Sequence, residues 1–142
     1  MPIPADIFQI WAALFGNANP PVPAQNLYAA NFNTSGLIYE SFVDNITANA
    51  GGGQSGAYKI TSEVSRITTV ANSGDSVILP ASVSGMSLTI INATATNAMN
   101  LFPNGTDQIN ALGASAAFSV AAGKTVEAYC VTAGQWHTIL SA

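Results

Sequence analysis

The chain has 142 residues and a formal net charge of −4, and only 7% of its residues are charged, against about 25% in a typical soluble domain. Three basic residues cannot form the basic stripe that binds nucleic-acid phosphates, nor a polybasic membrane-binding patch. We therefore expect no nucleic-acid partner and no membrane partner. So little charge favours a component of an assembly, whose surface is largely covered by other protein.

The first 56 residues show little sustained periodicity. Apolar residues three or four apart predict a short helix near residues 4–15, which ends before Gly16. Prolines and isolated aromatic residues follow, and the glycine-rich residues 49–56 predict a flexible linker. We interpret residues 1–56 as an extended N-terminal arm. Its expected partner-binding residues are Ile7, Ile10, Trp11, Leu14, Phe15, Tyr28, Phe32, Tyr39 and Phe42.

Strand patterns recur through residues 57–142, about eight to twelve residues apart and separated by turn residues. They cover residues 65–70, 76–80, 86–92, 97–103, 117–120, 125–132 and 136–140. No long helical pattern interrupts them, so the pattern argues against a parallel sheet with crossover helices. The sequence therefore predicts an all-β domain over residues 57–142, built as an antiparallel β-sandwich or barrel.

Alternation over residues 125–132 predicts two faces of a strand. One face carries Val126, Ala128 and Cys130, and the other carries Thr125, Glu127, Tyr129 and Val131. Cys130, the only cysteine, therefore has the position of a small core residue, which we favour over a nucleophile. A hairpin through residues 133–135 would bring it near His137, the only histidine, but no further catalytic motif accompanies the pair.

Asp75 and Asp107 lie in turn sequences. We interpret both as turn-capping residues in preference to calcium ligands, because calcium needs several oxygen ligands from one cluster. Asp6 and the absence of Lys or Arg near it predict no secretory signal. We expect no catalytic residues, no cofactor, no metal and no small-molecule substrate.

Tyr129 and Trp136 are the aromatic residues of the domain that could contact a glycan or a neighbouring subunit. Sugar-binding β-domains stack such rings against the ligand. Packing in the core or at an interface is the alternative, and we favour it over glycan binding.

From Ile46 to the C-terminus the chain resembles a family of short virion structural proteins of tailed bacteriophages. The stretches that carry the resemblance are Ile46–Gln54, Ser65–Ala71, Gly74–Pro80, Gly85–Asn92, Leu101–Pro103, Asp107–Asn110 and Gly134–His137.

The resemblance implies a capsid decoration (cement) protein, a non-enzymatic component that forms a homotrimer and braces neighbouring subunits of the major capsid protein. It implies a location on the capsid surface of the virion, after assembly in the host cytoplasm. A phage fibre or head appendage that binds a host glycan is the alternative. With so few charges, attachment should depend on hydrophobic contacts and be only weakly sensitive to salt.

Overall fold

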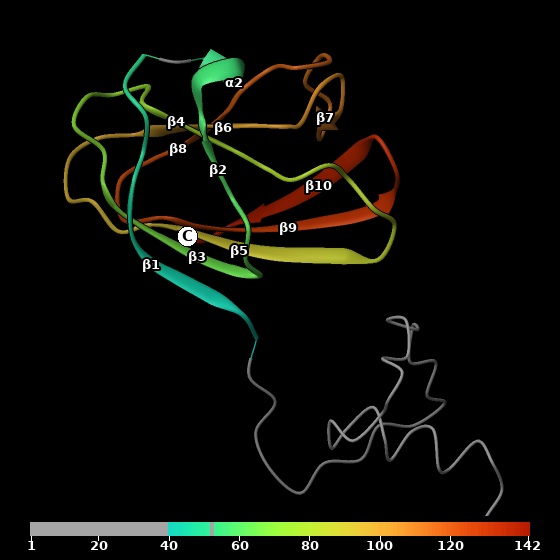
Figure 1. Cartoon of the computed structure of the whole chain (residues 1–142), viewed down its shortest axis with the longest axis horizontal. Coiled ribbons are helices and arrows are strands. Elements are labelled where there is room, and N and C mark those ends of the chain that lie inside the picture. Colours follow the sequence, from blue (N-terminus) through green and yellow to red (C-terminus); the bar gives the residue numbers. More distant parts are fainter. Residues whose placement is uncertain (1–39, 52) are drawn as a thin grey trace, which may run out of the picture. The chain divides into compact units, whose positions relative to one another are not determined.

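The computed structural model describes residues 40–51 and 53–142, which belong to one unit, Tyr39–Ala142 (Figure 1). The helix expected near residues 4–15 lies outside these residues. The elements of the described part are β1 (Phe42–Thr47), α2 (Gly53–Gly56), β2 (Tyr58–Lys59), β3 (Val64–Thr69), β4 (Ser76–Ile78), β5 (Met86–Asn92), β6 (Met99–Phe102), β7 (Gln108–Ile109), β8 (Phe118–Val120), β9 (Thr125–Thr132) and β10 (Gln135–Leu140).

The strands form two sheets, and the first nine strands alternate between them. One sheet has the order β1-β3-β5-β9-β10-β7 and the other the order β2-β4-β6-β8. Neighbours among β1, β3 and β5 are parallel, as are neighbours among β2, β4 and β6. Each turn of the chain thus adds one strand to each sheet, a solenoid-like coil, before β9 and β10 close the larger sheet as an antiparallel hairpin.

The all-β class is confirmed, whereas the expected antiparallel sandwich or barrel is wrong. Short strands separated by turns are compatible with two paths, a return beside the previous strand or a crossing to the opposite sheet. The crossing path makes parallel pairs without any crossover helix, so the absence of helical patterns did not exclude them.

The β unit also begins earlier than the expected boundary between residues 56 and 57. β1 pairs with β3 over Phe42–Thr47, so this part of the expected arm is a strand of the larger sheet. The glycine-rich segment includes α2, where Gln54 Nε2 donates hydrogen bonds to the carbonyls of Pro103 (2.8 Å) and Gly105 (2.7 Å). Residues 53–56 are therefore anchored to the turn after β6, and their interpretation as part of a flexible linker is wrong.

The inward-facing side chains of both sheets form one apolar cluster. Its fully buried members include Ile67, Val77, Leu79, Ile90, Met99, Leu101, Val120, Val126 and Trp136. Burial of each large apolar side chain stabilises the fold by about 1.5–3 kcal/mol. The cluster therefore joins the two sheets.

Asn92, at the end of β5, is a fully buried polar residue at the closing edge of this core. Its Nδ2 donates to the carbonyls of Asn97 and Val120, both at 3.0 Å, and its Oδ1 accepts a hydrogen bond from Thr94 Oγ1 at 2.7 Å. One side chain thus connects β5 to the loop before β6 and to β8, in the other sheet.

Candidate functional site

Four of the seven large hydrophobic side chains that are exposed in the described residues lie on the outer face of the six-stranded sheet, namely Phe42, Tyr129, Val131 and Ile139. Strand alternation places every second residue of β3, β5, β9 and β10 on this face. Cross-strand pairing aligns Phe42, Val64, Thr89, Glu127 and Ile139 in one row, each on a different strand. A second row aligns Ser87, Tyr129 and His137.

Apolar and aromatic side chains are exposed at several positions of this outer face. Phe42 on β1 is 74% exposed, Val131 at the end of β9 is 72% exposed and Ile139 on β10 is 61% exposed. Tyr129 is 39% exposed between them. Exposed large apolar groups gathered on one face are typical of protein interaction surfaces.

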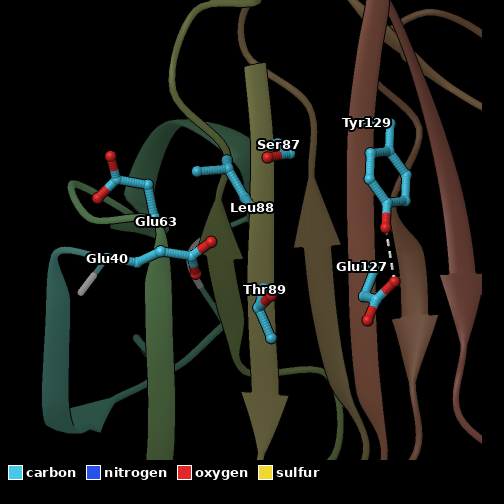
Figure 2. A pocket seen from close by; sticks show the side chains of 7 residues that line it. All are labelled: Glu40, Glu63, Ser87, Leu88, Thr89, Glu127 and Tyr129. Carbon is cyan, nitrogen blue, oxygen red and sulfur yellow. Dashed lines mark hydrogen bonds between the residues drawn. The ribbon is translucent and has the colours of Figure 1, made fainter. Parts of the chain in front are cut away.

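A shallow depression of about 180 Å³ lies at the centre of the outer face (Figure 2). Ser87 and Thr89 of β5 form its floor, with Glu127 and Tyr129 on one side and Glu40 and Glu63 on the other (Figure 2). The volume corresponds to roughly six water molecules at about 30 Å³ each. It can hold the end of one long side chain or part of a sugar ring.

Two of the three carboxylates of the depression have defined hydrogen bonds. Glu127 Oε2 accepts a hydrogen bond from the Tyr129 hydroxyl at 2.6 Å, which raises the pKa of Tyr129 above its ordinary value. Glu63 Oε2 accepts a hydrogen bond from Ser41 N at 2.8 Å, and Ser41 Oγ accepts one from Glu63 N at 3.1 Å. Tyr129 is therefore held beside Glu127, and Glu63 anchors the start of β1.

None of these three carboxylates has a cation within ion-pair distance in the part of the chain that the structure describes. The ion pair found there joins Arg66 and Asp44 at 2.9 Å, on the same face but away from the depression. A hydrogen bond from Asn45 N, and then the Arg66 guanidinium, hold the pKa of Asp44 below its ordinary value. Arg66 is thus already engaged, and the depression carries uncompensated negative charge.

Of the two aromatic residues expected to contact a glycan or a subunit, only Tyr129 lies on the outer face. Trp136 is fully buried in the core, and its Nε1 has no hydrogen-bond partner within residues 40–51 and 53–142. The contact role proposed for Trp136 is therefore wrong, and the core-packing alternative is confirmed. The reason is register: Trp136 pairs with Cys130, whose side chain also points inward.

Cys130 and His137 do not form a catalytic pair. The β9–β10 hairpin does bring the two strands together, but His137 pairs with Tyr129 on the outer face while Cys130 is buried on the inner face. Burial raises the pKa of the Cys130 thiol above its ordinary value, which disfavours the reactive thiolate. The position in the core predicted from strand alternation is confirmed.

Asp75 caps a turn in the structure, as expected, because its Oδ2 accepts a hydrogen bond from Asn72 N, three residues earlier, at 2.9 Å. Asp107 Oδ2 instead accepts a hydrogen bond from Ser82 N at 3.3 Å, so this carboxylate connects its turn to the distant loop before β5. Among the described residues, no three His, Cys, Asp or Glu side chains are arranged to hold a metal ion. Nor does that part of the chain contain a helix long and apolar enough to cross a membrane.

Of the expected arm residues, the structure describes Phe42, which is highly exposed on the edge strand β1. The other eight lie outside the described residues. Alternation in residues 125–132 correctly predicts that Val131 shares the face of Glu127 and Tyr129. Glu63 and Ile139 were not predicted on this face, because Glu63 joins Glu127 only through the pairing of β3, β5 and β9, and Ile139 only through the pairing of β9 and β10.

Comparison of the chain with family models, with curated proteins and with solved structures gave no match. The residues of the outer face therefore indicate what this surface can do. A surface with exposed apolar groups and a small acidic centre is suited to binding.

Proposed function

We propose that the chain is a non-enzymatic virion structural protein of a tailed bacteriophage, a capsid decoration protein that binds neighbouring major capsid protein subunits. The virion assignment depends on the resemblance of residues 46–142 to short phage virion proteins. The observation that carries the assembly role is the outer face, where Phe42, Val131 and Ile139 are exposed at 61–74%. Such groups are stabilised by contact with another protein.

In this proposal the chain forms a homotrimer, and the residues before β1 supply the capsid contacts. Their aromatic and apolar residues, including Trp11 and Phe32, would be buried on adjacent capsid subunits. Three modest contacts held in one trimer give strong avidity on a lattice, because the second and third contacts form at a high effective concentration.

Cosedimentation of the full-length protein with capsids that lack it tests this function. We expect attachment that survives high salt and is lost in a Trp11→Ser, Phe32→Ser double variant, while sedimentation equilibrium gives the mass of a trimer for both. Val83→Ser is the matched control, because Val83 is 57% exposed in a loop before β5. Attachment that is stripped by salt, or that is unchanged in the double variant, would contradict the proposal.

A glycan-binding module of a phage fibre or head appendage is the second candidate, and one observation favours it. Tyr129 lies beside Glu127 at a depression floored by Ser87 and Thr89, and such a set of groups can stack on and hydrogen-bond to a sugar. Glycan binding that is lost in Tyr129→Ala would support this candidate. Trp136 is unsuitable for the test, since its replacement would damage the core.

A further inference from the structure

We propose that the outer face is a docking surface for a partner protein that inserts an arginine side chain, surrounded by apolar residues, into the acidic depression. This inference rests on the proposed function as an assembly protein and names the chemistry of the surface that it binds. It commits to a protein partner, so a glycan and a second copy of this chain are competing outcomes of the test.

Charge complementarity is the first argument for a cationic anchor. Glu40, Glu63 and Glu127 line one depression, and no cation of the described residues pairs with them. The whole chain carries only three basic residues, of which Arg66 is bound to Asp44. A second copy packed on this face would bring two sets of carboxylates together, whereas a foreign basic residue would neutralise them.

The surroundings of the depression favour arginine over lysine. The Tyr129 ring lies beside Glu127, so a planar guanidinium can stack on the ring while it donates two parallel hydrogen bonds to the carboxylate. The ammonium group of lysine lacks the planar, forked geometry that this requires. The depression, at about 180 Å³, has room for the guanidinium and part of its methylene stem.

The apolar rim supplies the second argument, because it would exclude water from such an ion pair. Phe42 and Ile139 lie at opposite ends of the row that passes through Glu127, four strand spacings or roughly 19 Å apart at about 4.8 Å each. Val131 is exposed at the end of β9. An arginine anchor enclosed by apolar contacts is a common binding hot spot, and it is screened by salt much less than an exposed pair.

The probe for this inference is a disulfide-cyclised β-hairpin that displays one arginine among valine and leucine residues. Its binding to the full-length, isotope-labelled protein is measured by NMR titration. We expect chemical-shift changes at residues of β5 and β9 on the outer face. Replacement of the arginine by citrulline, its neutral isostere, or of the flanking apolar residues by serine should each weaken binding at least tenfold.

Protein variants identify the groups that bind the hairpin. Glu127→Gln should weaken binding about tenfold and Ile139→Ser several-fold, with Val83→Ser unchanged. Glu127 is chosen because Glu63 also holds Ser41, so that Glu63→Gln could disturb β1. Equal binding of the citrulline hairpin, shifts that map elsewhere, or no binding at millimolar hairpin concentration would overturn the proposal.

Sedimentation equilibrium of the same variants tests the competing occupant. Unchanged mass in Glu127→Gln and Ile139→Ser supports a foreign partner, and dissociation of the oligomer overturns it in favour of a second copy. Neither the hairpin titration nor the sedimentation measurement contains capsids. If the protein binds the hairpin but does not attach to capsids, the virion assignment is contradicted and the docking surface is still supported.

Discussion

The two faces of the six-stranded sheet differ in whether their apolar side chains are buried within the molecule or exposed on its surface. The inner face consists of apolar side chains such as Ile67, Ile90 and Val126, each fully buried against the smaller sheet. The outer face combines exposed apolar groups with Glu63, Glu127 and Tyr129 around a depression. The inner face thus stabilises the fold by its contacts within the chain, whereas Phe42, Val131 and Ile139 of the outer face are 61–74% exposed among the described residues. We therefore expect the fold to depend little on these outer side chains, which leaves them available for binding.

The largest effect is expected from Trp136→Ala on the inner face. Loss of this fully buried side chain leaves a cavity and should lower the free energy of unfolding by about 3–5 kcal/mol, measured by chemical denaturation. The adjacent variant His137→Ala, on the outer face, is the control and should stay within about 0.5 kcal/mol of the unmodified protein. Similar losses in both variants would show that the two faces do not differ in this way.

Asn92→Ala should have the next largest effect, since it removes the hydrogen bonds that connect β5 to β8. The carbonyl of Val120 would lose the amide donor, while the carbonyl of Asn97 would keep its hydrogen bond from Thr94 Oγ1 at 3.0 Å. A buried polar group left unsatisfied costs about 1–3 kcal/mol. Chemical denaturation gives the loss, with Asn72→Ala, at an exposed turn, as the matched control. A loss below that of the control would mean that water replaces the amide.

Ile139→Ser tests the outer face directly. Because Ile139 is already 61% exposed, its replacement should change the free energy of unfolding by no more than about 0.5 kcal/mol. The same variant should weaken binding of the arginine hairpin several-fold. Strong destabilisation would show that the fold requires Ile139. The two faces would then not differ in their contribution to stability.

The smallest effect concerns the titration of Tyr129. Its hydroxyl donates a hydrogen bond to Glu127, so the native state holds the phenolic proton more tightly than the unfolded state does. Any stability from this contact is fully present below the pKa of the tyrosine in the unfolded chain, about 10. It is lost as the pH rises through the higher pKa of Tyr129 in the native protein.

In Glu127→Gln the pKa of Tyr129 should fall towards its ordinary value, as measured by NMR of the tyrosine ring carbons against pH. Tyr58 serves as the internal control, because it lies in the other sheet. If the pKa of Tyr129 does not change, the Glu127 carboxylate is not the cause of the raised value.

The local features of the fold were predictable from local chemistry. β-Branched residues and turn residues placed β3, β5, β6, β8, β9 and β10 within a few residues of their observed bounds. Alternation in β9 also separated Cys130 from Tyr129 correctly. In contrast, β2 and β7 have two residues each, too few for any pattern, and exist because β4 and β10 pair with them.

The turn at Asn104–Gly105 shows that a local sequence does not determine which sheet the next strand joins. The pair predicts a hairpin, and Gly105 does adopt a positive φ of 53°. However, the strands on either side, β6 and β7, belong to different sheets. A turn sequence specifies the local backbone conformation, whereas the sheet that the next strand joins depends on which apolar face it buries.

The amino-acid sequence by itself determined the all-β class, the positions of most strands, the turn role of Asp75 and the scarcity of charge. Each of these depends on residues close together in the chain. Only the tertiary structure decided that the strands coil between two sheets, that Trp136 is buried and that Glu40, Glu63 and Glu127 share one depression. These features depend on strand register, which joins residues far apart in the chain: a shift of one residue in pairing would exchange the inner face for the outer one.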